Sequence, residues 1–131
     1  MKNIFSKLKN EKGQAAVEFA LVAIVLLLFV FGIVEFGRAW YRADLLKNAA
    51  NTGARTCAVT KDISQATLAA QGAIPNYKSP PTNIIISTCT PTPVTQVTVT
   101  VTEPFNPVVP LLLPMLNSIT LTRTATYRVE P

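Results

Sequence analysis

The longest uninterrupted pattern along the chain is an apolar segment near its start. Residues 15–34 are apolar or small apart from Glu18, and the segment contains no proline. A membrane-spanning helix needs about 20 mainly apolar residues, so this segment has the length and composition of one. Gly32 fits the pattern, because glycine is common in membrane helices. The pattern predicts a transmembrane helix over residues 14–36.

Beyond Glu35 the apolar positions become periodic. Steps of three and four residues separate the apolar or small positions, which are Phe36, Trp40, Ala43, Leu46, Ala50, Gly53 and Cys57. This is the period of an amphipathic helix, and no proline interrupts the chain before Pro75, so one helix is expected over residues 14–58. We expect its apolar stripe to pack on a sheet, with a coiled-coil seam as the alternative. The arginines on the polar side are expected to be solvated, or else to contact lipid headgroups.

The second half of the chain predicts a small α+β domain. Asp62 can cap a short second helix that begins after it. Residues 83–89 are rich in β-branched side chains and predict a first strand. Valine and threonine alternate strictly over 96–102, and threonines alternate with mainly apolar residues over 119–129. Such alternation predicts two half-buried strands whose threonines face outward. The simple interpretation of this threonine-rich face is a solvated surface, and the alternative is a surface for adhesion.

The segment from Pro104 to Asn117 holds four prolines and the cluster Leu111-Leu112-Leu113, and it predicts a loop. Its leucines either fold over a sheet edge or stay exposed as a contact for another subunit. Three consecutive strands would form a small antiparallel sheet that is not stable with both faces exposed, so we expect the amphipathic helix to cover one face. The predicted fold class is α+β, with a long N-terminal helix packed on an antiparallel sheet of about three strands.

Charge is distributed unevenly along the chain. The formal net charge is +5, and four of the lysines precede the apolar segment, where Glu11 is the only acidic residue. Excess lysine on one flank of a membrane segment directs that flank to the cytoplasm, so the rest of the chain is expected outside it. This is an orientation signal more than a nucleic-acid patch, and no nucleic-acid partner is expected.

The chain offers little catalytic chemistry. It contains no histidine, which removes the commonest general base and the Ser-His-Asp and Cys-His arrangements. Its two cysteines are too few for a cysteine-only zinc site, so we expect no enzyme, no metal and no cofactor. Cys57 ends the helical stripe and Cys89 ends the first strand, and outside the cytoplasm they can form a disulfide. Two buried free thiols are the alternative.

The most specific motif is the octapeptide Lys12-Gly13-Gln14-Ala15-Ala16-Val17-Glu18-Phe19. It joins a basic leader to an apolar helix that carries one carboxylate near its start, where a charge is costly in lipid. This arrangement resembles the prepilin signal of type IV pilin-like proteins. The continuations Gly32-Ile33-Val34-Glu35-Phe36-Gly37-Arg38 and Asn48-Ala49-Ala50-Asn51-Thr52-Gly53-Ala54-Arg55 resemble the TadE-like family, the minor pilins or pseudopilins of tight-adherence pilus systems.

The resemblance implies how these residues are used. A prepilin peptidase would cut between Gly13 and Gln14, and Glu18 with Phe19 would serve subunit assembly. The new ammonium of Gln14 would pair with a nearby carboxylate in a low-dielectric setting. The implied partners are the peptidase, other pilin subunits in a homo- or hetero-oligomeric filament, the inner-membrane assembly platform and the lipid bilayer.

Together these observations predict three parts: a leader over 1–13, the long helix over 14–58, and a periplasmic or extracellular α+β domain over 59–131. The expected protein is a single-pass inner-membrane, pilin-like subunit that enters or initiates a pilus for adhesion or secretion. The alternative is a signal-anchored periplasmic binding or interaction protein without a filament role. A secretory signal peptide cleaved near Gly37-Arg38-Ala39 is a further alternative.

Overall fold

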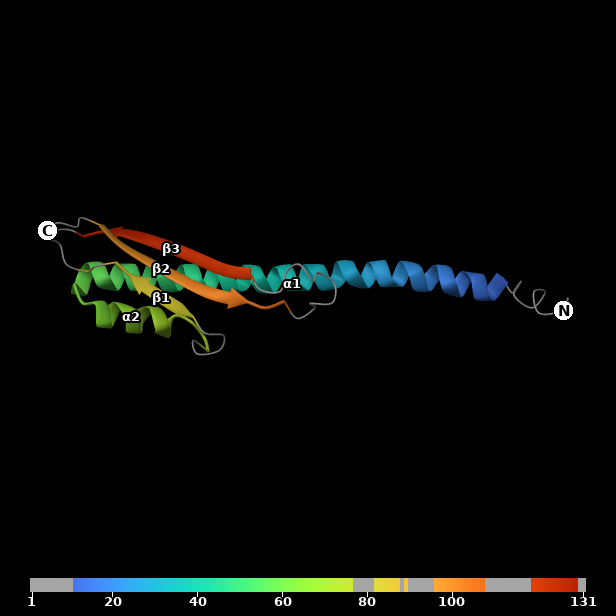
Figure 1. The fold of residues 1–131 in the computed structure, drawn as a ribbon, viewed down its shortest axis with the longest axis horizontal. Coiled ribbons are helices and arrows are strands. Elements are labelled where there is room, and N and C mark those ends of the chain that lie inside the picture. Colours follow the sequence, from blue (N-terminus) through green and yellow to red (C-terminus); the bar gives the residue numbers. More distant parts are fainter. Residues whose placement is uncertain (1–10, 77–81, 88, 90–95, 108–118, 130–131) are drawn as a thin grey trace. The chain divides into compact units, whose positions relative to one another are not determined.

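The computed structural model describes residues 11–76, 82–87, 89, 96–107 and 119–129. Its elements are α1 (Glu11–Thr60), α2 (Ile63–Gly72), β1 (Asn83–Ile86), β2 (Gln96–Phe105) and β3 (Ile119–Arg128), drawn in Figure 1. The three strands form one antiparallel sheet in the order β1-β2-β3. This confirms the predicted α+β class. The chain divides into two compact units, residues 1–36 and residues 37–131.

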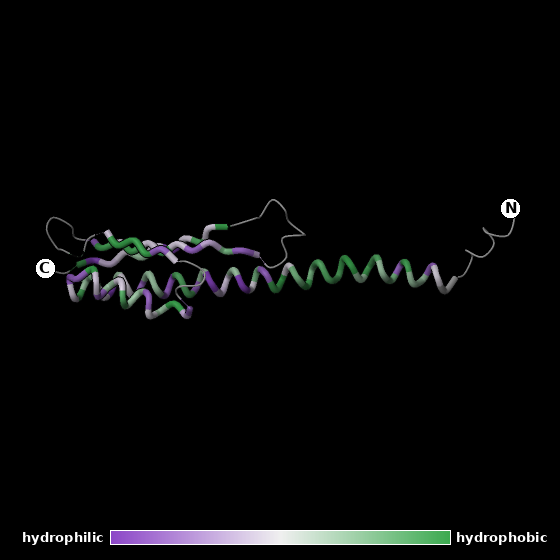
Figure 2. Tube along the Cα trace, turned by 60° about the horizontal axis from the view of Figure 1, so that its bottom comes forward, coloured by the Kyte–Doolittle hydropathy of each residue, from purple (hydrophilic) through white to green (hydrophobic). Residues whose placement is uncertain are grey.

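The first unit contributes the apolar part of α1, which Figure 2 shows as almost entirely hydrophobic. The helix is long and apolar enough to span a membrane, with a mean hydropathy of 3.0 over its most apolar 18 residues. The large side chains of that stretch are exposed, for example Phe19 at 74% and Ile33 at 71%. Exposing so much apolar surface to water is unfavourable, so these side chains require a nonpolar environment.

The end of α1 and the start of α2 are defined by a short polar turn. Lys61 takes a left-handed conformation with φ of 56°, and its N–H donates to the carbonyl oxygen of Cys57 at 3.0 Å. This is the backbone pattern that commonly terminates helices. The Asp62 carboxylate then accepts a hydrogen bond from the backbone N–H of Ser64 at 2.7 Å, which confirms Asp62 as the cap of α2.

The valines of β2 form the centre of the second unit. Val97, Val99 and Val101 are fully buried, and they pack with the completely buried helix residues Leu46, Ala49, Ala50, Ala54 and Cys57. The helical stripe therefore packs on the sheet, as the period predicted. The first two residues of the predicted stripe do not take part, because Phe36 and Trp40 are each 68% exposed. The sequence-based assignment of those two positions to the buried side was wrong.

The second helix lies beside the C-terminal part of α1 (Figure 1), and small residues permit the close approach. A Cβ atom added at Gly53 would lie 3.0 Å from the Cβ of Ala70 and 3.5 Å from Cγ1 of Val99. A contact of 3.0 Å is tighter than nine in ten real Cβ contacts, so a side chain at position 53 would require Ala70 of α2 to shift by a few tenths of an ångström.

The central strand is longer than the sequence suggested. We expected Pro104 to open a loop, but β2 continues through Phe105, and Pro104 pairs with Thr120 of β3. The strand is longer because the alternation continues past the valines: Glu103 and Phe105 face inward as the valines do, and both are buried. The first strand is shorter than predicted and ends at Ile86. The leucine cluster at 111–113 and most of the expected loop lie outside the described residues.

The outer face of the sheet carries paired threonines. Thr98 lies opposite Thr126 and Thr100 opposite Thr124, with hydroxyl oxygens 3.4 Å and 3.3 Å apart. The threonines therefore face outward, as the alternation predicted. Only Ala125 of β3 is buried, and Arg123, which lies opposite the buried Val101, is exposed.

Candidate functional site

The residues of the N-terminal motif lie on the first turns of α1. Gln14, Glu18 and Phe19 are all exposed within the chain, and nothing lies within 4 Å of the place where Gly13 would carry a Cβ. The side-chain amide of Gln14 donates a hydrogen bond from Nε2 to Oε1 of Glu18 at 3.1 Å. Residues four apart share one face of a helix, so this contact follows from the spacing. The structure thus brings Gln14 and Glu18 together and leaves Glu18 accessible to a partner.

The two cysteines lie at the far end of α1. Cys57 and Cys89 form a disulfide in the structure, with their Cα atoms 5.2 Å apart, and both residues are fully buried. The bond joins the last turn of α1 to the segment that follows β1. In the part of the chain that the structure describes, histidine, cysteine, aspartate and glutamate nowhere gather as a metal-binding group of three or more. Formation of this disulfide in the native protein stays a prediction.

Reduction of that disulfide is expected to lower the free energy of unfolding of the second unit by about 3–4 kcal/mol, because a loop spanning 32 residues is no longer closed in the unfolded chain. Denaturant unfolding of the full chain in detergent, with and without reductant, measures the difference. The Cys57→Ala/Cys89→Ala double variant should unfold like the reduced protein and should not respond to reductant. Alkylation of both thiols in wild-type protein that has never met reductant would contradict the disulfide.

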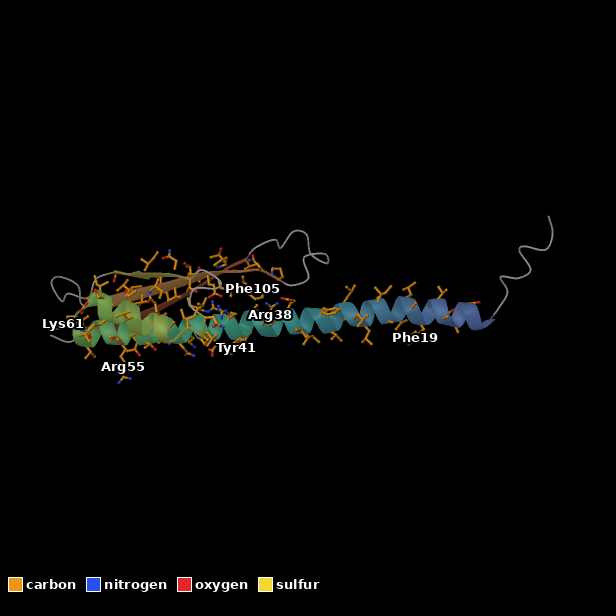
Figure 3. The ribbon with its side chains drawn as sticks, turned by 90° about the horizontal axis from the view of Figure 1, so that it is seen from below. Phe19, Arg38, Tyr41, Arg55, Lys61 and Phe105 are labelled. Atoms are coloured by element: carbon orange, nitrogen blue, oxygen red, sulfur yellow. A yellow bond between two sulfur atoms is a disulfide. The ribbon has the colours of Figure 1, made fainter. Side chains whose placement is uncertain are left out.

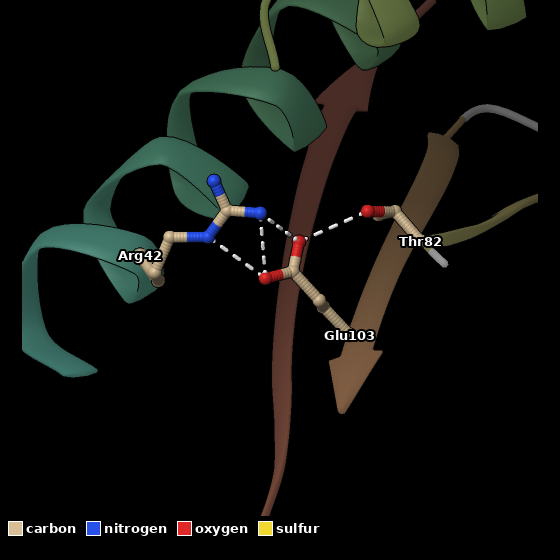
Figure 4. A network of polar contacts seen from close by, with 3 residues as sticks. All are labelled: Arg42, Thr82 and Glu103. Atoms are coloured by element: carbon tan, nitrogen blue, oxygen red, sulfur yellow. Dashed lines mark hydrogen bonds and ion pairs between the residues drawn. The ribbon is translucent and has the colours of Figure 1, made fainter. Parts of the chain in front are cut away.

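A polar network at the other end of the sheet was not predicted from the sequence (Figure 4). Arg42 of α1 donates from Nε to Oε1 and from Nη2 to Oε2 of Glu103 on β2, each at 2.8 Å. The hydroxyl of Thr82 donates to Oε2 of the same carboxylate at 2.9 Å. Arg42 was expected to be solvated, whereas its side chain is only 19% exposed and binds a carboxylate that is 1% exposed.

The network is needed because Glu103 occupies a core position. It follows Val97, Val99 and Val101 at the same parity, so its side chain points toward the helix with theirs. A buried carboxylate without partners is strongly unfavourable, whereas a two-pronged arginine contact satisfies both oxygens. The sequence contained a signal for this ion pair, because a single acidic residue among the inward-facing positions of a strand needs a cation on the element that covers it.

A cleft of about 280 Å³ lies beside this network. It is lined by Arg38, Tyr41 and Arg42 of α1 and by residues 103–106 at the end of β2. The guanidinium of Arg38 lies over the ring of Phe105, 5.6 Å from its centroid, and Figure 3 shows these two side chains together with Tyr41 nearby on the helix. Cation–π contact with Phe105 orients Arg38 at the rim of the cleft.

Comparison with known proteins identifies the N-terminal part of the chain. Residues 13–55 match the family described as TadE-like protein. No curated protein matches the chain. No solved structure matches it either. The family is a structural, non-enzymatic one associated with Tad pili. The matched segment begins at the motif glycine and includes Glu18, the apolar helix and Arg42, so this part of the chain is similar to TadE-like proteins, as its sequence indicated.

Proposed function

We propose that this protein is a minor pilin, or pseudopilin, of a Tad or type IV-like pilus, which it enters or initiates. The TadE-like match over residues 13–55 is the observation that carries the proposal. The structure supports it in two ways. Its first unit is an apolar helix with exposed side chains, suited to storage in a bilayer and later to packing among neighbouring helices. Its second unit has its own core of helix and sheet.

The proposed chemistry belongs to partners and not to this chain. A prepilin peptidase cuts between Gly13 and Gln14 on the cytoplasmic side and creates an ammonium at Gln14. Glu18 lies one helical turn further on, exposed and hydrogen-bonded only by the Gln14 amide among the contacts that the structure describes. In a low-dielectric medium an unpaired carboxylate is unfavourable, so the ammonium of an adjacent subunit stabilises it. Phe19, beside it and 74% exposed, supplies apolar contact in the same interface.

The proposed location is the inner membrane, with one crossing and the second unit in the periplasm. The lysines of the leader support this orientation because positively charged flanks stay cytoplasmic. The periplasm is also oxidising, which is the condition that the Cys57–Cys89 bond requires. After assembly the second unit would stand in the pilus, outside the cell.

We expect the chain to be cleaved between Gly13 and Gln14. Intact mass and N-terminal sequencing of protein from native membranes should find a chain that begins at Gln14. Gly13→Val is expected to block processing by placing a branched side chain at the scissile bond. The matched control is Gly37→Val, a second α1 glycine with nothing within 4 Å of its Cβ position, which should be processed normally.

The same measurement separates the competing functions. A chain that still begins at Met1 when the peptidase is present would indicate a signal-anchored periplasmic protein without a filament role. A chain that begins near Trp40 would indicate a secretory signal peptide. Either result would contradict the pilin proposal.

A further inference from the structure

We propose that the side of α1 turned away from the sheet is a contact between copies of this chain, in which Asp44 of one copy pairs with Arg55 of another. The inference rests on the proposed function, because it requires several copies to pack together in a filament. The contact surface consists of four polar residues, Asp44, Asn48, Asn51 and Arg55, which we call the polar seam. Steps of four, three and four residues place them on one side of the helix.

The polar seam is a part of α1 that the second unit leaves uncovered. Asp44, Asn48 and Arg55 are exposed, and Asn51 is half-buried. Figure 3 shows Arg55 directed away from the sheet, and the other side of the helix carries the residues that pack on β2. Among the residues that the structure describes, none of the four side chains makes a hydrogen bond or an ion pair. Their polar groups are therefore available to a partner.

The charges of the polar seam lie at its two ends, and the two residues between them are neutral amides. Asp44 and Arg55 are separated by eleven residues, which is almost three whole helical turns and about 16 Å along the axis. Two copies whose seams met at the same height would bring aspartate to aspartate and arginine to arginine, which is repulsive. A stagger of about 16 Å instead brings Asp44 of one copy to Arg55 of the other.

The neighbouring charges of α1 are compatible with this stagger. Arg38 and Arg42 lie on the side of the helix that faces the end of β2. Lys47 is exposed beside the seam, and in a staggered copy it would be level with residues 36 and 58, neither of which is charged. Between residues 37 and 62, a stagger of eleven residues brings no two like charges to the same height. The charge pattern thus favours the staggered contact and opposes the unstaggered one.

A staggered contact has a direction, because each copy offers its aspartate to one neighbour and its arginine to another. Such a heterologous contact does not close on itself when it is repeated with a rise, and it generates a filament. Helices whose seams face a common axis would remove these charges from water, which strengthens the attraction between them. The amides of Asn48 and Asn51 can both donate and accept hydrogen bonds there, and asparagine in a helical seam is known to fix its register.

Charge reversal tests the pairing in cells in which each variant replaces the wild-type chain. Asp44→Arg or Arg55→Asp alone should lower the amount of this protein in sheared pili by about tenfold, because a like-charge contact replaces an attractive one. Asp44→Arg/Arg55→Asp inverts the pair and should return to nearly the wild-type amount. Lys47→Asp is the matched control, an exposed residue of the same helix with the same change of charge as Arg55→Asp, and it should be incorporated normally. Immunoblots of the membrane fraction check that each variant is supplied and processed equally.

Cross-linking measures the stagger directly. When copies with Asp44→Cys and copies with Arg55→Cys are expressed together, a short bismaleimide should link them into a dimer. Either variant expressed alone should not be linked, because identical positions are about 16 Å apart along the axis. Wild-type protein, whose two cysteines are buried, provides the blank.

Four results would overturn the proposal. Normal incorporation of both single reversals, or no recovery in the double reversal, would exclude the pairing while leaving the pilin proposal intact. An equal defect in Lys47→Asp would assign the effect to the net charge of the helix. Linking of the Asp44→Cys variant expressed alone would show an unstaggered contact. Absence of the wild-type chain from filaments would contradict both the proposed function and this inference.

Discussion

Replacing Arg42 with alanine should lower the free energy of unfolding of the second unit by about 3–5 kcal/mol, the usual cost of removing one partner of a buried ion pair. The remaining carboxylate of Glu103 is 1% exposed and would keep only the hydroxyl of Thr82 among the partners that the structure describes. Both charge-assisted hydrogen bonds from the arginine would be lost, and the charge would stay at a buried position without a cation beside it. Denaturant unfolding of the full chain in detergent, followed by circular dichroism, measures the change.

Two further variants test whether the unpaired charge is the cause. Arg42→Met/Glu103→Met removes both charges, and we expect it to recover most of the lost stability, because a packed apolar pair often replaces a buried ion pair without cost. Arg55→Ala removes an exposed arginine of the same helix and should change stability by less than about 0.5 kcal/mol. If the double variant is as unstable as Arg42→Ala, or if Arg42→Ala unfolds like wild type, this account of the network is wrong.

The second large effect is expected at Glu18. Glu18→Ala should leave the protein in the membrane, since insertion depends on summed hydrophobicity and the substitution raises it. Incorporation into filaments should fall at least about tenfold, because the ammonium that the proposed cleavage creates would lose its counter-charge, and a tenfold change needs only about 1.4 kcal/mol. Immunoblots of membrane and sheared-pilus fractions from cells that carry each variant measure both quantities.

Glu18→Gln is the informative companion to that variant. It keeps a side chain of the same length that can still accept a hydrogen bond from the Gln14 amide, which lies 3.1 Å from Glu18 in the structure. If the charge is what matters, glutamine should fail in assembly as alanine does. Assembly by the glutamine variant at wild-type levels would show that the hydrogen bond suffices, and assembly by the alanine variant would contradict any role of Glu18.

Much of this fold could be predicted because local pattern and tertiary contact agree. The valine–threonine alternation predicted which residues of β2 face inward and which face outward. The steps of three and four residues predicted the residues of α1, from Ala43 to Cys57, that pack on the sheet. Asp62 capped a helix in the way that an aspartate before a helical pattern usually does. In each case the signal lies within a few residues of the element that it specifies.

The errors have a different physical origin. Phe36 and Trp40 share the helical period with Leu46, but period alone does not tell where the covering sheet ends. A proline such as Pro104 usually ends a strand, yet β2 continues past it because the next residue, Phe105, is an inward-facing residue that is buried. The pairing of Arg42 with Glu103 joins positions 61 residues apart, and only the register of the sheet against α1 brings them together. Parity pointed to Glu103 as an unusual residue but did not select its partner.

The exposed Arg123 affects whether copies of this protein can aggregate through the edge of the sheet. β3 is the last strand of the described sheet, and such a strand presents unpaired backbone groups to which a second copy can add by hydrogen bonding. If the proposed function holds, copies of this protein wait in the membrane before assembly, where unwanted strand exchange between them is a hazard. Arg123 lies in the row of Ala125 and opposite the buried Val101, so a copy added at this edge would have to bury its charge. A single cation in the middle of the strand thereby opposes aggregation while leaving the rest of β3 free to pair with β2.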